Sequence, residues 1–290
     1  MNIKIWRQYI DPHHCFSRAM AWFTTRSWPW LKNWQIRQFI RKYAVNMSEA
    51  QYSDAAAYVT FTDFFTRHLK ENARHFVRDK KTVISPADAC IAQIGSMTEG
   101  VLIQAKGRAF SVEALLGGDS ISAHDFQNGF FATLYLAPKD YHRVHMPLSG
   151  LLKKMIYIPG DLFSVNLHTA DHVPNLFARN ERVVCLFETD AGPMAMVLVG
   201  AMFVASIVTT WAGVVTPARR RQVQVTSYDQ PIVLHQGDEM GYFNFGSTVI
   251  VLFGPQAIAW ENCVPNQTVR MGQVLAQNVR YSPLAHPAIA

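Results

Sequence analysis

The sequence predicts an α+β protein in which a β-rich main domain follows a helical N-terminal extension. Beyond about residue 82 the chain breaks into short apolar runs separated by Gly, Pro and Asp, which is typical of strands and tight turns. Before that point, residues 15–44 and Thr60–Lys70 have the pattern of short helices. We therefore expect a helical region at residues 1–75 and a β-rich domain at residues 76–290.

The individual elements follow from local patterns. Residues 15–44 predict two or three short helices, and Thr60–Lys70 predicts an amphipathic helix with Thr62 as N-cap and Asp63 in its first turn. A helical pattern returns at Ser111–Gly118. Strands are expected within residues 83–95, 130–142, 150–163, 182–190, 222–228 and 243–253.

The composition limits the class of protein. Hydrophobic residues make up 49% of the 290 residues and charged residues 17%, so the chain can bury a large core and is not disordered. The four cysteines are widely spaced and form no CxxC pair, which argues against a zinc knuckle or a disulfide framework and fits a reducing cytoplasm. The net charge of +6 favours an anionic partner.

The basic excess is concentrated in residues 1–45, where tryptophans alternate with cations. The cations are Lys4, Arg7, Arg18, Arg26, Lys32, Arg37, Arg41 and Lys42. The tryptophans are Trp6, Trp22, Trp28, Trp30 and Trp34. This combination on short helices favours a membrane interface, where rings lie at headgroup depth and cations meet lipid phosphate. The alternative is a helical hairpin whose tryptophans pack on the main domain; nucleic acid is disfavoured because no polar basic stripe forms.

A second apolar stretch, Ala191–Val215, contains no charged residue and is long enough for a transmembrane helix. It is rich in Val, Ile and Thr, and Gly192, Pro193, Gly200 and Gly213 interrupt it. We therefore predict two buried strands joined by a turn, with the membrane helix as the alternative.

Three polar clusters have side chains suited to catalysis. They are Asp88 in "SPAD", His142 and His145 in "YHRVHMP", and Ser247 after Gly246 in the apolar stretch "FNFGSTVIVLF". Each has a structural alternative: a turn carboxylate for Asp88, a structural or metal-binding histidine pair, and a backbone-bonded hydroxyl in a β-bulge for Ser247. Together, aspartate, histidine and serine could form a nucleophile, its base and an orienting carboxylate.

The three motifs together resemble the phosphatidylserine decarboxylases, which are pyruvoyl-dependent enzymes. The stretches Tyr157–Asn166, Val173–Thr189 and Glu239–Phe243 also look like the bacterial family, so the resemblance covers most of the chain. Two positions depart from its usual motifs: Phe245 stands for leucine before the glycine, and Ala89 stands for glycine after the aspartate. Both changes keep the reacting groups.

The resemblance implies a proenzyme that cuts its own chain between Gly246 and Ser247. Asp88, His145 and Ser247 match the residues of self-cleavage, and Ser247 becomes a pyruvoyl group that forms a Schiff base with the amine of phosphatidylserine. His142 is left to contact the lipid phosphate or to protonate the carbanion. No metal is implied.

The implied partners are the lipid in its membrane and the two products of cleavage, chains 1–246 and 247–290. A homodimer of the processed unit would also fit the family. The expected location is peripheral, on the cytoplasmic side of the cell membrane, where the substrate lies.

Two other classes of function remain open at this point. A Ser-His-Asp hydrolase of lipid esters would use the same residue types, but the sequence has no GxSxG motif. A non-catalytic, membrane-bound β domain would require the aspartate, histidine and serine to be a coincidence.

Overall fold

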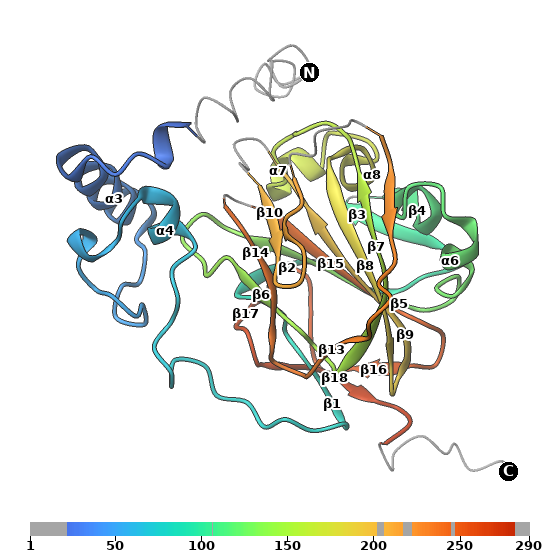
Figure 1. The fold of residues 1–290 in the computed structure, drawn as a ribbon. Helices are drawn as coiled ribbons and strands as arrows, with labels where there is room; N and C mark the ends of the chain where they lie inside the picture. The colour runs from blue at the N-terminus through green and yellow to red at the C-terminus, as the bar shows by residue number, and fades with distance from the viewer. Residues whose placement is uncertain (1–21, 106, 202–205, 217–221, 245–246, 282–290) are drawn as a thin grey trace, which may run out of the picture.

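A large antiparallel sheet forms the body of the protein, with the helical N-terminal region at its side (Figure 1). The computed structural model describes residues 22–105, 107–201, 206–216, 222–244 and 247–281. The predicted α+β class is confirmed, since strands dominate the part of the chain after residue 82. The division at residue 75 stays a prediction.

The main sheet has nine strands in the order β12-β7-β8-β9-β15-β5-β2-β17, with β13 also paired to β7. Their bounds are β2 Ala89–Ser96, β5 Phe130–Leu136, β7 Gly150–Ile158, β8 Arg182–Thr189, β9 Gly192–Val199, β12 Gln224–Thr226, β13 Ile232–Leu234, β15 Ser247–Phe253 and β17 Thr268–Val269. All seven residues of β15 are buried, because β9 and β5 flank it and both faces of the sheet are covered.

Two smaller sheets and a hairpin complete the β structure. The four-stranded sheet has the order β11-β10-β14-β6, and the three-stranded sheet has the order β1-β18-β16. The strands are β1 Thr82–Ile84, β3 Val101–Ala105, β4 Arg108–Ser111, β6 Arg143–His145, β10 Ile207–Thr209, β11 Gly213–Val214, β14 Glu239–Phe243, β16 Ile258–Trp260 and β18 Val274–Asn278. Strands β3 and β4 pair only with each other among the described residues.

The apolar stretch Ala191–Val215 contains strands, as predicted. Strands β9 and β10 both lie within it, but they belong to different sheets and so do not form a hairpin. No helix among the described residues is long and apolar enough to cross a membrane.

The helices whose bounds lie within the described residues are short except for α3. They are α3 Pro29–Tyr43, η1 Ala55–Ala57, α4 Phe61–Phe65, α5 Val112–Leu115, α6 Ser120–His124, α7 Leu167–Ala170 and α8 Leu176–Arg179. The predicted N-cap of α4 was wrong by two residues. The hydroxyl of Thr60, and not that of Thr62, accepts the N–H of Asp63, and the Asp63 carboxylate accepts the N–H of Val59 in return.

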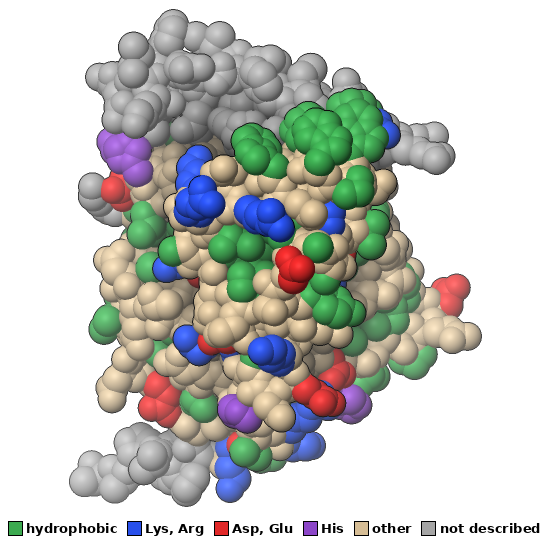
Figure 2. Space-filling view, turned by 90° about the vertical axis from the view of Figure 1, so that its left-hand side faces the viewer, with side chains coloured by type: hydrophobic (Ala, Val, Ile, Leu, Met, Phe, Trp, Pro, Cys, Tyr) green, Lys and Arg blue, Asp and Glu red, His purple; other side chains and the backbone are tan. Residues whose placement is uncertain are grey.

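The N-terminal helices have a core of their own, built from Ile36 of α3, Phe61, Phe64 and Phe65 of α4, and Tyr58. The tryptophans lie outside it. Trp22, Trp28, Trp30 and Trp34 are between 50 and 73% exposed, so the alternative in which they pack on the main domain is wrong for these four. Figure 2, viewed from the side of α3 and α4, shows bulky hydrophobic side chains gathered beside basic ones. Trp6 lies outside the described residues.

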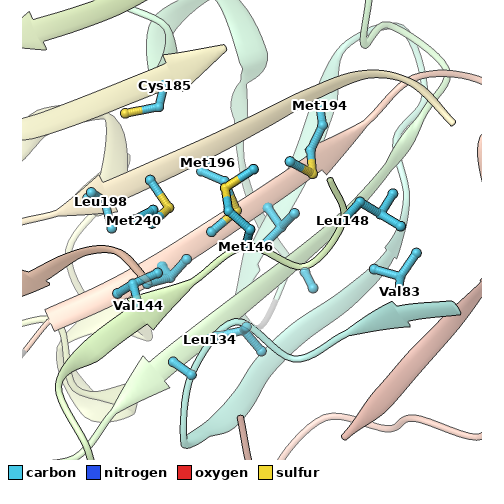
Figure 3. Packing of buried hydrophobic residues seen from close by; sticks show 14 of the residues in the cluster. Val83, Leu134, Val144, Met146, Leu148, Cys185, Met194, Met196, Leu198 and Met240 are labelled. Atoms are coloured by element: carbon cyan, nitrogen blue, oxygen red, sulfur yellow. The ribbon is translucent and has the colours of Figure 1, made fainter. Parts of the chain in front are cut away.

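The two faces of the main sheet bury separate hydrophobic clusters. One face packs on the two smaller sheets, and Figure 3 shows Met146, just after β6, beside Met196 of β9. The other face is covered by the β3–β4 hairpin and the helices α5 to α8. Because strand side chains alternate, Val249 and Val251 face the first cluster, whereas Ile250 and Leu252 face the second.

Candidate active site

Ser247 is the first residue of β15, the strand near the middle of the main sheet. It pairs with Leu136, the last residue of β5, and its side chain is fully buried. Its hydroxyl has no hydrogen-bond partner among the described residues. The alternative, a hydroxyl bonded to backbone in a β-bulge at Gly246, therefore has no support in this part of the chain. A buried hydroxyl without a partner is costly and is a common feature of reactive sites. Gly246 lies outside the described residues.

Two chain segments join the main sheet to the four-stranded sheet. One joins β5 to β6 and contains His142; the other joins β14 to β15 and leads to Ser247. The two segments contact each other at both ends. At one end Ser247 pairs with Leu136, and at the other Phe243 N donates a 3.1 Å hydrogen bond to His142 O. Three residues separate Phe243 from Ser247, so Phe243, which bonds to His142, is four chain steps, or at most roughly 14 Å, from the serine.

His142 is fully buried and its ring has one free nitrogen. Nδ1 is 2.9 Å from the carbonyl oxygen of Asp140. Because a carbonyl only accepts, Nδ1 carries the proton and Nε2 keeps its lone pair. Nε2 is buried without a partner among the described residues. Burial away from water lowers the pKa of His142 to about 3, so the ring is neutral at physiological pH.

His145 lies on β6 with both ring nitrogens bonded. Nδ1 donates to the carbonyl oxygen of Gly237 at 2.9 Å, and Nε2 is 3.0 Å from the hydroxyl of Tyr141. The donation to a carbonyl again leaves the lone pair on Nε2, which accepts from Tyr141. Burial lowers the pKa of His145 below its ordinary value, and the nearby Arg143 adds to this. Both histidines are therefore neutral bases.

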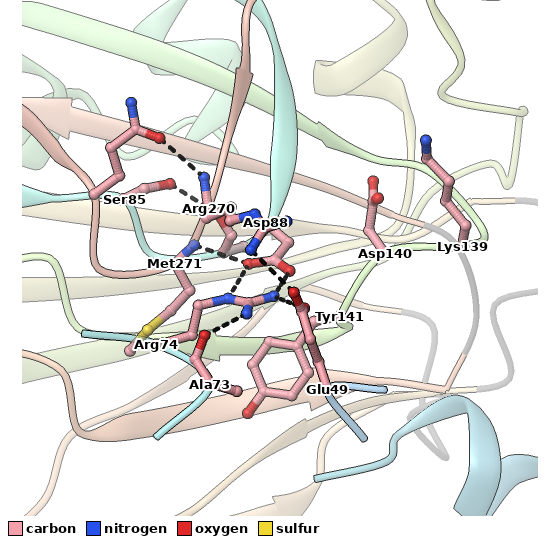
Figure 4. A network of polar contacts seen from close by, with 12 residues as sticks. Glu49, Ala73, Arg74, Ser85, Asp88, Lys139, Asp140, Tyr141, Arg270 and Met271 are labelled. Carbon is pink, nitrogen blue, oxygen red and sulfur yellow. Dashed lines mark hydrogen bonds and ion pairs between the residues drawn. The ribbon is translucent and has the colours of Figure 1, made fainter. Parts of the chain in front are cut away.

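Asp88 lies immediately before β2 in a network of ion pairs (Figure 4). Its carboxylate pairs with the guanidinium of Arg74, and Oδ1 accepts the backbone N–H of Met271 at 2.9 Å. Arg74 also pairs with Glu49 at 2.9 Å. The expected direct hydrogen bond between Asp88 and His145 is not present among the described residues. Asp88 is nevertheless close enough to act on the charge of His145 and of Tyr141.

Two cavities adjoin this region, and Tyr135 of β5 lines both of them. One has a volume of about 570 Å³ and is mainly apolar. Its lining includes Phe23, Trp34, Phe39, Phe61, Phe65 and Tyr135. The other has a volume of about 410 Å³, is more polar, and contains Asp88, Arg74 and Arg67. An apolar and a polar cavity side by side suit an amphipathic ligand.

No group of three or more metal-ligating side chains occurs in the part of the chain that the structure describes. Cys90, Cys185 and Cys263 are free thiols.

Comparison with known proteins decides the family. The model of the phosphatidylserine decarboxylase family matches residues 61–277. The chain belongs to the phosphatidylserine decarboxylase family. A second family model, described as PSD, matches residues 3–44.

Curated relatives of this phosphatidylserine decarboxylase family match over nearly the whole chain. A protein of Ectopseudomonas mendocina is 54% identical over 279 residues, which cover 94% of this chain and 97% of the relative. A protein of Bordetella petrii is 53% identical over 274 residues, which cover 93% and 95%. Both are named phosphatidylserine decarboxylase proenzyme. The chain is therefore a decarboxylase enzyme.

Sequence reasoning proposed Asp88, His142, His145 and Ser247 as site residues but did not predict their partners. Arg74 and Tyr141 contact the predicted residues directly, and Phe65 of α4 lies against His142 with ring centroids 4.1 Å apart. The aromatic-rich sequence of α4 predicted a helix, but no local pattern indicates which side chain it presses on. These contacts depend on how the helical region sits on the sheet.

Proposed function

We propose that this decarboxylase cuts its own chain between Gly246 and Ser247 and converts Ser247 into a pyruvoyl group. The processed enzyme then releases CO2 from phosphatidylserine to give phosphatidylethanolamine. The observation that carries the proposal is the hydroxyl of Ser247, which is fully buried, has no partner among the described residues and directly follows a glycine. The curated relatives are named as proenzymes, which supports a processed chain.

The cleavage follows from elementary chemistry. Ser247 Oγ attacks the carbonyl carbon of Gly246, and the C–N bond of that peptide breaks as an ester forms at Oγ. Elimination across Cα–Cβ of Ser247 releases the carboxylate of Gly246, and hydrolysis of the resulting enamine gives a keto group and ammonia. Gly246 has no side chain to obstruct the attack.

A neutral histidine must take the hydroxyl proton of Ser247. We assign this role to His145, with Asp88 as the carboxylate that supports it, as the family resemblance implies. In the structure His145 Nε2 accepts from Tyr141, so His145 acts either through Tyr141 or after that hydroxyl turns away. The oxygens of Asp88 are bonded to Arg74 and to Met271 N, so Asp88 acts on His145 through the electrostatic effect of its negative charge.

The site fits the proposed pyruvoyl group. Ser247 begins a fully buried strand, so a keto group formed there is shielded from water and held in place by pairing with Leu136. When bound, such a group withdraws electrons from the substrate as CO2 leaves. We assign proton transfer in the processed enzyme to Nε2 of His142, because its lone pair is available and it has no hydrogen-bond partner within the described part of the chain.

The two products of cleavage stay together in the proposed enzyme. Chain 247–290 supplies β15 near the centre and β17 at the edge of the main sheet, and also β16 and β18 of the three-stranded sheet, so separating the chains would disrupt both sheets. The family resemblance also implies a homodimer of this processed unit, which sedimentation velocity would test.

We also propose that the enzyme lies on the cytoplasmic face of the cell membrane and takes its substrate from the bilayer. The exposed tryptophans and neighbouring cations of the N-terminal helices suit a headgroup layer. The apolar cavity of about 570 Å³ is lined by Phe23 and Trp34 of that same region, so it suits the hydrocarbon part of a lipid. The free cysteines fit a reducing compartment.

The proposal is tested by supplying phosphatidylserine labelled at the serine carboxyl and measuring released CO2. Wild-type enzyme should release label without added pyridoxal phosphate. Pretreatment with borohydride together with substrate should abolish release, because it reduces the keto group or its adduct. Activity that requires pyridoxal phosphate, or that resists borohydride, would contradict the proposal.

A further inference from the structure

Three cations are buried among the described residues: Lys32, Arg67 and Arg182. Lys32 and Arg182 are satisfied, since their nitrogens donate to backbone carbonyl oxygens. Arg67 differs from both. Its Nε and Nη1 are buried and have no hydrogen-bond partner in the part of the chain that the structure describes. Buried, unbonded donors on a charged group are costly and require an explanation.

The remaining nitrogen of Arg67 fixes the position of the guanidinium. Nη2 donates to the carbonyl oxygens of Lys139 at 2.9 Å and of Asp140 at 3.2 Å. The guanidinium carbon lies 5.6 Å from the ring centre of Phe64. Among the described residues, no carboxylate lies within ion-pair distance of Arg67. The side chain is therefore held rigidly with its charge unpaired.

Arg67 lines the polar cavity of about 410 Å³. The charged side chains around this cavity are Arg67, Arg74, Lys139 and Arg270 on the positive side and Glu49, Asp88 and Asp140 on the negative side. Glu49 and Asp88 are bound to the two other arginines. The carboxylate of Asp140 accepts the N–H of Ala137 at 2.8 Å. Arg67 is thus the arginine of this cavity whose donors are left for a ligand.

The cavity adjoins the reacting groups. The carbonyl oxygen of Asp140 that accepts from Arg67 is also 2.9 Å from Nδ1 of His142, so one carbonyl separates the guanidinium from this ring. Leu136, which pairs with Ser247, stands between Tyr135 and Ala137, and both of these line the cavity. An anion held by Arg67 would lie next to the site of decarboxylation.

We propose that Arg67 binds the phosphodiester of the phospholipid substrate through its free guanidinium N–H groups. This inference rests on the proposed function and names the residue that recognises the headgroup. Guanidinium groups bind phosphate oxygens through charge-assisted hydrogen bonds, and burial strengthens these bonds. The bound phosphate gives Arg67 the partner that the protein does not supply.

The substrate also has a carboxylate, but the phosphodiester suits this role better. The carboxylate leaves as CO2, so a cation bound to it would stabilise the starting state more than the transition state. The phosphodiester keeps its charge throughout the reaction. Binding it stabilises substrate and transition state equally, which lowers KM and leaves kcat unchanged.

The test compares wild type, Arg67→Gln and Arg67→Lys with short-chain phosphatidylserine. The inhibition constant of dihexanoylphosphatidylmethanol is measured in parallel, because this lipid has a phosphodiester but no amine or carboxylate. Arg67→Gln should raise both KM and the inhibition constant by about tenfold or more and leave kcat nearly unchanged, since a charged hydrogen bond has about this value. Arg67→Lys should have values of KM and of the inhibition constant between those of wild type and Arg67→Gln. A rise in KM with an unchanged inhibition constant would show that the carboxylate is the ligand and would overturn the proposal, as would unchanged values for both.

Two controls separate binding from folding. Arg182→Gln removes a buried arginine whose donors are satisfied, so it should lower the melting temperature without changing the inhibition constant. If Arg67→Gln fails to fold, the test uses wild type with two inhibitors. Uncharged dihexanoylglycerol should inhibit at least about tenfold more weakly than dihexanoylphosphatidylmethanol, which has the phosphodiester. Equal inhibition would overturn the inference. Wild type that neither cleaves nor decarboxylates would instead refute the proposed function.

Discussion

The ring of Phe65 lies against the ring of His142, with their centroids 4.1 Å apart. Phe65 belongs to α4 in the N-terminal helical region, whereas His142 belongs to the segment that leads into β6. The helical region therefore covers the candidate active site directly. This contact helps to exclude water from His142, and the loss of water is what lowers its pKa to about 3.

The buried His142 makes stability depend on pH in a defined direction. The unfolded chain binds a proton near pH 6.5 and the folded chain only near pH 3, so stability is fully present above pH 6.5 and falls as the pH decreases. When the pH falls from 7 to 5, protonation of this histidine in the unfolded chain should lower the free energy of unfolding by about 2 kcal/mol. The comparison uses Ser247→Ala, which keeps the chain in one piece, with and without His142→Asn. Over the same pH change, the double variant should lose about 2 kcal/mol less unfolding free energy than Ser247→Ala alone. Urea unfolding at pH 7 and pH 5 measures these losses. If both proteins lost the same unfolding free energy, the assignment would be contradicted.

Ser247→Ala should give a single uncut chain without decarboxylase activity, because both the nucleophile and the precursor of the keto group are removed. Ser247→Cys and Ser247→Thr retain a nucleophile and should cleave slowly with impaired activity. Thr133→Val is the matched control, since Thr133 also has a buried hydroxyl without a partner among the described residues but lies on β5 away from the bond. Activity in the alanine variant, or loss of cleavage in the Thr133 variant, would contradict the role of Ser247.

The two histidines should give different phenotypes. His145→Ala and Asp88→Asn should accumulate uncut proenzyme, because they remove the proposed base and the carboxylate that supports it. His142→Ala should still cleave but should turn over lipid about 10²-fold more slowly, the usual loss when a general acid or base is removed. A gel and a CO2 assay on the same preparations check both. If the His142 variant stayed uncut and the His145 variant matured, the two roles would have to be exchanged.

Much of this arrangement could be predicted from the sequence, because it depends on local patterns. The apolar stretch Phe243–Phe253 predicted one buried strand; β15, which is fully buried, takes up only Ser247–Phe253, and Phe243 instead ends β14. Glycine and proline within Ala191–Val215 indicated strands in place of a membrane helix, and β9 and β10 confirm this. The resemblance of three short motifs identified the four candidate residues.

What the sequence did not predict depends on contacts between distant segments. Arg74 was not assigned to Asp88, nor Phe65 to His142, since each pair joins the N-terminal region to the sheet. The error at the N-cap of α4 has a local cause. Thr60 and Thr62 are both capping residues by type, and only the reciprocal bonds with Asp63 distinguish them.

The exposed tryptophans should bind the membrane. Replacing Trp28, Trp30 and Trp34 together by Ser should weaken flotation with anionic vesicles by more than about tenfold, because interfacial aromatic area is lost, while self-cleavage stays complete. Ile121→Ser on α6 is the control, since Ile121 is also highly exposed but lies outside the N-terminal region. Unchanged flotation of the triple variant, or an equal loss in the control, would contradict the membrane role.

The mass of the purified chains tests the central claim most directly. Denaturing mass spectrometry of active enzyme should show two chains, 1–246 and 247–290, and the smaller should begin with a pyruvoyl group that resists Edman degradation until it is reductively aminated. A smaller chain that begins with an ordinary serine would show simple hydrolysis, and one intact 290-residue chain in fully active enzyme would show no processing at all. Either result would contradict the account.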